Sequence, residues 1–409
     1  MKKTVLSLCA AALFSGMLFA DTVTLYNDPT TGQIFSEAGE GRVKIGEFVD
    51  AKTAHKSVPV YAHTSKLKFS GLTYIGFTHT DFEDGETSTG GDYKEDISRF
   101  EIRRAYLQLK AYLMEDPKSY YRITLDVHQD TKADNGGTDG DMLLRVKYAY
   151  IYLNDILPHT GVEFGIAHRP WHDYEEHTAW YYRDISKVLV EQGNGAHLSN
   201  SADFGLNFKT KTTYFDSELG IYNGEGYHST QIKEGLSFEW RATAHILGVR
   251  GKDKQTKKSY WDVSFFGQYN KKHKDNGNGG FDDLVFGGLH TVYNRPDFLA
   301  AAQYVRSLDT ADESGRVSKQ AGSGYSVNGE YRFGTEYQYR ILARYDSWTP
   351  EKQNGADEKE QRTYIAGFAW QQNHNLQWVV NVDVTDNEEG SEREKYNGSS
   401  LMLTAQIEF

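Results

Sequence analysis

The stretch from Ser98 to Asp130 alternates apolar and polar side chains with a period of two residues. Two such arms are joined by a turn that contains Pro117, which fixes φ and has no N–H to donate to a strand ladder. Each arm has roughly ten or more residues, the length that a strand needs to cross a lipid bilayer. A soluble β-sandwich can show the same alternation, so the recurrence of the pattern distinguishes the two folds.

Alternating segments of this kind recur from Lys66 to the end of the chain. They are Lys66–Thr80, Ser98–Leu113, Tyr120–Asp130, Leu143–Leu153, Gly161–Pro170, Ala202–Thr210, Tyr214–Tyr222, Leu236–Gly248, Ser259–Lys271, Asp283–Tyr293, Phe298–Leu308, Gly322–Phe333, Tyr337–Ser347, Gln361–Asn373, Leu376–Asp386 and Ser399–Phe409. The number of segments is even, as it is in single-chain bacterial outer-membrane barrels.

Short and long connections alternate along this series. Lys211–Thr213 and Asn373–Asn375 are short, whereas Asp81–Ile97 and Trp171–Ser201 are long. Short periplasmic turns and long outer loops are typical of membrane barrels, and no short repeat motif suggests a soluble repeat protein. The sequence therefore predicts an all-β fold, a transmembrane antiparallel β-barrel of about 16 strands over residues 66–409. The connection Val249–Lys258 is long for a turn, and we expect the strand register to be weakest there.

Composition supports an exported membrane barrel. The chain is 14% aromatic and rich in Tyr and Gly, yet after Ala20 it has no run of about eighteen apolar residues that could form a membrane helix. A barrel meets both conditions because only every second residue faces lipid. The net charge of -12 argues against a nucleic-acid partner, which needs a basic surface.

The first 65 residues do not follow the alternation. Residues 1–20 have the pattern of a cleaved signal peptide, with Lys2 and Lys3 before an apolar core and Ala20 at its end. The only cysteine lies in this core and would be lost on cleavage, so no disulfide is expected. Residues 21–65 predict a small hairpin and a third short strand. We expect a periplasmic extension there, with a plug inside the pore as the alternative.

Several short motifs lie in the early strands. They are Phe100–Leu107 (FEIRRAYL), Tyr121-Arg122, Tyr148-Ala149-Tyr150 and Glu163-Phe164-Gly165. These motifs resemble the phosphate-selective porin family; the similarity covers Ser98 to Pro170 in motif and Lys66 to Phe409 in architecture. It implies a sixteen-stranded outer-membrane porin and a homotrimer. The terminal aromatic Phe409 is similar to the signal by which outer-membrane proteins reach their insertion machinery.

The longest connection, residues 171–201, corresponds by position to the third outer loop, which folds into the lumen in sixteen-stranded porins. A connection of this length usually has a function. Its candidate constriction residues are Trp171, Asp173, Tyr174, Glu175, Glu176, Trp180, Tyr181 and Asp184. Either the aromatic residues fix the loop to the wall and the acids are solvated, or the rings form a track on which sugars stack.

Basic residues concentrate in the first four strands, whereas acids outnumber bases in the expected outer loops. The alternation places five bases in the lumen: Arg104, Lys110, Arg122, Arg145 and Lys147. The opposite orientation would cost roughly 2–4 kcal/mol for a lipid-facing base near the midplane. A basic wall opposite an acidic loop predicts a transverse field that selects solutes by size and dipole. Alternatively, these bases pair with wall acids such as Asp126 and Glu101.

The function that these patterns favour is passive diffusion of small hydrophilic solutes and ions through a porin of the bacterial outer membrane. Its alternatives are an anion- or phosphate-selective porin and a sugar-specific porin. A surface adhesin or an outer-membrane hydrolase has less support, since no Gly-x-Ser-x-Gly elbow is present. We expect no enzyme activity and no cofactor, with membrane lipids and small solutes or anions as partners. His168, His172 and His177 lack the spacing of a metal site, so none is predicted.

Overall fold

The computed structural model describes residues 22–30, 34–35, 37–49, 66–83, 96–129, 142–227, 235–248, 258–275, 280–308, 321–351, 359–391 and 393–409. The chain divides into two compact units, Met1–Ser65 and Lys66–Phe409. The first contains an antiparallel sheet in the order β2-β1-β3, with β1 at Thr22–Asn27, β2 at Ile34–Phe35 and β3 at Val43–Val49. The expected hairpin and third strand both form. The expected signal segment, residues 1–20, lies outside the described residues.

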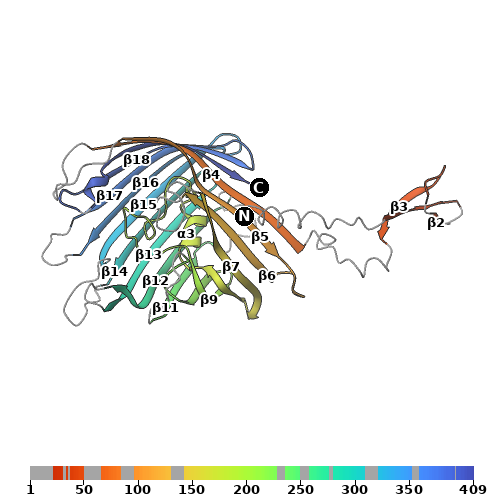
Figure 1. Cartoon of the computed structure of the whole chain (residues 1–409), viewed down its shortest axis with the longest axis horizontal. Helices are drawn as coiled ribbons and strands as arrows, with labels where there is room; N and C mark the ends of the chain where they lie inside the picture. The colour runs from red at the N-terminus through yellow and green to blue at the C-terminus, as the bar shows by residue number, and fades with distance from the viewer. Residues whose placement is uncertain are drawn as a thin grey trace, which may run out of the picture. The chain divides into compact units, whose positions relative to one another are not determined.

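The second unit is a closed barrel of sixteen antiparallel strands, which confirms the predicted fold (Figure 1). The strands are β4 (Leu67–Phe82), β5 (Ile97–Ala111), β6 (Tyr120–Gln129), β7 (Met142–Leu157), β8 (Thr160–His168), β9 (Ala202–Lys211), β10 (Phe215–Tyr222), β11 (Ser237–His245), β12 (Tyr260–Asp275), β13 (Phe281–Arg295), β14 (Phe298–Ser307), β15 (Gly322–Phe333), β16 (Tyr339–Pro350), β17 (Gln361–Gln371), β18 (Leu376–Asn387) and β19 (Gly398–Glu408). Helix α3 spans His172–Thr178, and a 3-10 turn, η4, spans Glu394–Tyr396.

Alternation sorts the side chains of each strand between the two faces of the wall. In β14, Phe298 and Tyr304 are exposed on the outside, whereas Gln303 and Ser307 are buried on the inside. Apolar residues outside and polar residues inside are typical of a barrel that spans lipid. In the part of the chain that the structure describes, no helix is both long and apolar enough to cross a membrane.

Backbone hydrogen bonds between the first and last strands close the barrel. β19 pairs with β4, and beyond β19 Phe409 exchanges two backbone hydrogen bonds with Gly71 at 3.0 and 3.1 Å. The ring of Phe409 lies where a Cβ on residue 71 would be, so any other residue at this position would displace that ring. β11 and β12 pair in continuous register from Ser237 to His245, although most of the connection 249–258 is outside the described residues.

Two β-bulges on neighbouring parts of the wall carry a basic residue; further register shifts occur between β7 and β8 and between β12 and β13. Between β4 and β5 the register shifts by one residue, which makes Arg103 the extra residue. Between β6 and β7 the same shift makes Lys147 the extra residue. A bulge changes the direction of the side chain that it carries. Each bulge therefore adds a basic side chain to the interior of the barrel.

Candidate functional site: the interior of the barrel

The segment 171–201 lies inside the barrel and contacts the inner face of several strands (Figure 1). Tyr260 of β12 donates a hydrogen bond to the carbonyl of Thr178 at 2.6 Å. Asn328 of β15 donates to the carbonyl of Ala179 at 2.8 Å. Further along, Arg344 of β16 donates to the carbonyl of Lys187 at 2.8 Å, and Asn194 donates to Thr363 of β17 at 2.9 Å.

Apolar packing supports these hydrogen bonds. Trp171 stacks on Phe266 of β12, with ring centroids 3.6 Å apart and an angle of 4° between the planes. Leu189 and Val190 have no exposed surface and belong to the same cluster as Phe286 and Trp348 of the wall. These wall residues face inward although they are apolar. Strands that are apolar on both faces, such as Phe265-Phe266 in β12, are the sequence signal that could have predicted where this segment packs.

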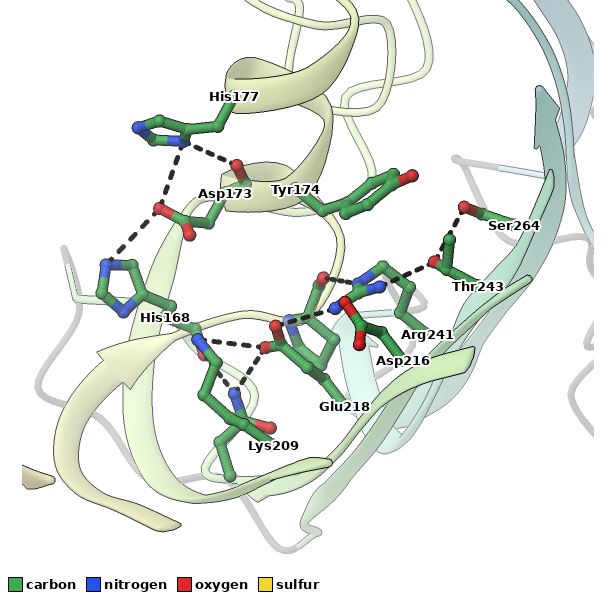
Figure 2. Close-up of polar contacts among 12 residues, drawn as sticks. His168, Asp173, Tyr174, His177, Lys209, Asp216, Glu218, Arg241, Thr243 and Ser264 are labelled. Carbon is green, nitrogen blue, oxygen red and sulfur yellow. Dashed lines mark hydrogen bonds and ion pairs between the residues drawn. The ribbon is translucent and has the colours of Figure 1, made fainter. Parts of the chain in front are cut away.

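A charged network holds the beginning of the segment, as Figure 2 shows. Arg241 of β11 is 3% exposed and donates to the carbonyl of Pro170 at 3.0 Å, to Thr243 at 2.7 Å and to Glu218 at 2.9 Å. Its guanidinium also lies over the ring of Tyr174, 4.4 Å from the centroid. The guanidinium thus contacts both the wall, through Thr243 and Glu218, and the start of helix α3, through Pro170 and Tyr174.

The same network continues across the wall strands in alternating charges. Lys209 of β9 lies 3.3 Å from both Glu218 of β10 and Glu163 of β8. Glu163 contacts Nδ1 of His168 at 3.3 Å, and Nε2 of His168 lies 3.5 Å from Asp173 of helix α3. Opposite charges on adjacent strands compensate one another's burial, so this part of the wall is a fixed support for the helix.

Most of the aromatic residues of the segment are buried against the wall. Trp171, Trp180 and Tyr182 are each at most 4% exposed, and Tyr174 donates to Asp262 of β12 at 2.7 Å. Tyr181 is different, because it is only partly buried and lines the central cavity. Four of these five rings therefore fix the segment to the wall, and Tyr181 is the ring that reaches the lumen.

The predicted acids of the segment fall into two groups. Asp173 and Glu176 line the central cavity. Glu175 and Asp184 instead face the wall, where Gln303 donates to Glu175 and Thr404 donates to Asp184 at 2.7 Å. Burial raises the pKa of Glu175 to about 8 and also raises the pKa of Asp184. Glu175 therefore adds little negative charge to the lumen at neutral pH, and both carboxyls face the wall and not the cavity.

The two acids of the cavity are also partly compensated. Glu176 forms an ion pair with Arg183, which belongs to the same segment. Burial opposes ionisation of Asp173, but His168 and His177 hold the pKa of its carboxyl well below its usual range. Asp173 in turn raises the pKa of His177, whose side chain is 70% exposed. Asp173 thus remains charged beside a histidine that can titrate.

The central cavity has a volume of about 660 Å³. Five basic and three acidic residues line it, so its lining has an excess of positive charge: Lys110, Arg122, Lys147, Arg183 and Arg340 against Asp173, Glu176 and Glu408. Arg183 and Arg340 were not predicted. Arg183 lies in a connection without regular alternation, whereas the alternation of β16, with Ile341 outside, is a signal that could have identified Arg340.

The five predicted wall bases separate by their partners. Arg104 and Arg145 lie 3.8 and 2.8 Å from the same carboxylate oxygen of Asp126, which has no exposed surface. Arg103, which was also not predicted, lies 3.0 Å from Glu101 and donates to the carbonyl of Ile185 at 3.3 Å. For these residues the structure has the alternative arrangement, in which the wall bases pair with the wall acids Asp126 and Glu101.

Lys110, Arg122 and Lys147 instead lie next to aromatic rings. Within the described ranges, no carboxylate oxygen is within 4.0 Å of these three side chains. The ammonium of Lys147 is 4.5 Å from the ring centroid of Tyr106, and the guanidinium of Arg122 is 4.6 Å from that of Tyr148. The predicted role of these three bases in the pore, and that of the residues of segment 171–201 in a constriction, stay predictions.

No group of three His, Cys, Asp or Glu residues that could hold a metal ion occurs among the described residues. Burial lowers the pKa of His172 to about 3, so its imidazole is neutral at neutral pH. His168 already contacts Glu163, Asp173 and Arg122. These three contacts account for His168 without a metal.

No protein-family model and no curated protein matches the sequence. Solved structures do match its fold. The anion-selective porin from Comamonas acidovorans has a TM-score of 0.60 at 11% identity, covering 84% of this chain and 99% of that one. Salmonella typhi OmpF in complex with daunomycin has 0.55 at 15% identity, covering 84% and 97%. OmpT, an outer membrane protein of Vibrio cholerae in its trimer form, has 0.55 at 11% identity, covering 84% and 99%.

At this level of identity, the likeness extends to the fold and not to what passes through the barrel. In each of these three comparisons the match covers 97–99% of the solved protein. The barrel therefore shares the fold of outer-membrane porins.

Proposed function

We propose that this protein is a water-filled channel of the bacterial outer membrane, through which small hydrophilic solutes and ions diffuse passively. The observation that carries this proposal is a closed sixteen-stranded barrel with a charged central cavity and an apolar outer face. Barrels of this size enclose an aqueous channel, whereas eight strands leave only enough space for side chains.

The same proposal assigns the remaining parts of the chain. Residues 1–20 direct export and are cleaved, residues 21–65 form a periplasmic extension, and residues 171–201 form the constriction. We infer a homotrimer in contact with outer-membrane lipids; the solved Vibrio cholerae OmpT in trimer form supports a trimer for this fold. Migration of unheated protein on a denaturing gel tests it, because a stable trimer runs at about three times the mass of heated protein.

Reconstitution into planar bilayers is the decisive experiment. A channel gives stepwise conductance that scales with salt concentration, whereas an outer-membrane hydrolase gives lipid or peptide turnover and an adhesin gives neither. We infer no enzyme activity for this chain. Absence of conductance from folded protein would overturn the proposal.

A transverse field across the cavity would arise from Lys110, Arg122 and Lys147 opposite Asp173 and Glu176. Anion preference is a second candidate function, favoured by the excess of basic lining residues. Within the described part of the chain, four of them have no carboxylate partner: Lys110, Arg122, Lys147 and Arg340. Reversal potentials in a salt gradient distinguish modest from strong selectivity. Arg104→Glu should shift them toward cations, and an unchanged value would exclude Arg104 from the conducting path.

A further inference from the structure

The central cavity combines unpaired cations with aromatic rings. Lys110, Arg122 and Lys147 reach it from the adjacent strands β5, β6 and β7. Tyr106 and Tyr148 lie among them, and the hydroxyl of Tyr106 is 3.3 Å from the ammonium of Lys147. The cavity is therefore a place where a positive potential and ring surfaces occur together.

Lys147 has no carboxylate in direct contact within the described part of the chain. Its side chain is 5% exposed, and its described neighbours are the rings and hydroxyl of tyrosines, not a carboxylate. A buried ammonium is costly unless it is paired, and cation–π contacts offset only part of that cost. An anion that enters the cavity would complete the compensation.

The rings that line the cavity restrict the kind of anion. Four tyrosines line it: Tyr74, Tyr106, Tyr148 and Tyr181. Tyr106 and Tyr181 keep part of their surface exposed. A site specific for inorganic phosphate typically uses several forked guanidinium donors. On β5 to β7 the cavity has one arginine, Arg122, and two lysines with flexible stems, whereas the lining Arg340 lies on β16 and Arg183 is paired with Glu176. Aromatic walls with a few polar groups are typical of sites for organic ligands.

We propose that the central cavity binds a small aromatic carboxylate, of the benzoate class, during passage through the channel. The carboxylate contacts Lys110, Arg122 and Lys147, and the ring of the solute packs against Tyr106 and Tyr181. This inference rests on the proposed channel function and adds a solute class to it. Among the lining acids, Glu176 is compensated by Arg183, so repulsion of the carboxylate comes mainly from Asp173 and Glu408.

The test measures how added anions reduce the chloride current of the full-length protein in planar bilayers. Benzoate, acetate and inorganic phosphate are titrated separately at neutral pH. We expect benzoate to reduce the current at the lowest concentration, because only benzoate uses both the cations and the rings. Lys147→Met should raise the half-blocking concentration of benzoate about tenfold. Arg295→Met removes the same charge from an exposed pair with Asp297, outside the cavity lining, and should leave that concentration nearly unchanged.

Two substitutions at Tyr106 separate the ring from the charge. Tyr106→Phe keeps the ring and should retain the preference for benzoate over acetate, whereas Tyr106→Leu should abolish the preference without changing the block by acetate. Heat-dependent gel mobility verifies that each variant is folded. Equal block by benzoate and acetate, or stronger block by phosphate, would overturn the aromatic site. Normal conductance without block by any anion would overturn the site and leave the channel intact, whereas absent conductance would overturn the proposed function itself.

Discussion

At the scale of single residues, the partner of a charged side chain decides what that charge can do. Asp126 is fully buried and balances both Arg104 and Arg145. Lys147 is the bulge residue of β7, two positions after Arg145, but its ammonium lies beside the rings of Tyr106 and Tyr148. Equal formal charges therefore contribute differently to the field in the lumen, because a paired charge is largely cancelled at a distance.

The first prediction concerns Asp126. Asp126→Asn removes the shared carboxylate and leaves two guanidinium groups without a charge partner. We expect reversal potentials in a salt gradient to shift toward anions. Asp155→Asn is the control, because Asp155 is exposed at the end of β7 and its left-handed φ of 50° suits asparagine as well. An identical reversal potential for both variants would show that Asp126 does not balance charge in the conducting path.

The second prediction concerns Glu175 and pH. Burial raises the pKa of its carboxyl from 4.5 to about 8, so the folded protein holds this proton where the unfolded chain has released it. The contribution of this group to the free energy of unfolding is therefore fully present below about pH 4.5 and is lost as pH rises to about 8. Glu175→Gln keeps the acceptor for Gln303 and cannot ionise. Its stability relative to the native protein should increase across this window, by at most on the order of 5 kcal/mol.

Melting temperatures in detergent at pH 5, 7 and 9 measure this difference. Glu115→Gln serves as the control, since Glu115 is exposed in a turn and should show no such trend. A constant difference between Glu175→Gln and the native protein at all three pH values would contradict the burial of an unpaired carboxyl.

At the scale of elements, helix α3 depends on the wall more than on its own sequence. The helix has only seven residues, too few for an independently stable helix, and no side-chain cap at its N-terminus. Arg241 of β11 binds the carbonyl of Pro170 just before the helix and covers Tyr174 within it. The direction in which the chain enters the lumen is thus set by a strand more than sixty residues later in the sequence.

The third prediction is that Arg241→Lys loosens this element. Lysine has no planar fork and cannot contact Pro170, Thr243 and Glu218 together while it covers Tyr174. We expect a loss of about 1–3 kcal/mol of stability and more open-channel current noise. Arg295→Lys is a matched control, because Arg295 forms an exposed pair with Asp297. Equal noise in the two variants would mean that the helix is held by its other contacts.

At the scale of the whole molecule, the segment 171–201 forms much of the apolar core inside the barrel. It contributes Leu189 and Val190 to one cluster, and Ile185 and Val188 to another that includes Leu342 of the wall. The barrel is therefore filled on this side, whereas the tyrosine-lined side near β5 to β7 keeps the cavity. The uneven filling gives a sixteen-stranded ring a restricted passage.

The fourth prediction tests this division by replacing residues 172–200 with a short Gly-Ser linker. The ends of the segment are already close, since the N–H of Arg169 donates to the carbonyl of Ser201 at 3.2 Å. We expect the barrel to form, because its strand pairs do not involve the segment. Conductance should rise several-fold, and the melting temperature should fall because apolar wall residues such as Phe266 lose their cover. Unchanged conductance would place the restriction elsewhere.

The strands and their order could be predicted from the sequence because alternation and turn chemistry act over a few residues. Expected Ser98–Leu113 became Ile97–Ala111, and expected Phe298–Leu308 became Phe298–Ser307. The inward direction of Arg103 could not be predicted, since it depends on a bulge that appears only when β5 pairs with β4. The inward location of Arg183 depends on how the segment 171–201 packs against distant strands, whereas that of Arg340 follows the alternation of β16, in which Ile341 faces outward.

The amino-acid sequence by itself determined a lipid-spanning barrel of sixteen strands, because each strand needs only a period of two residues and a turn at each end. Tertiary structure alone decided which charges act in the lumen. Arg145 meets Asp126 across a strand pair, and Asp184 meets Thr404 across 220 residues, so neither pairing has a local signal. The physical reason is that an interior charge is defined by its neighbours in space, and closure of the barrel brings those neighbours together.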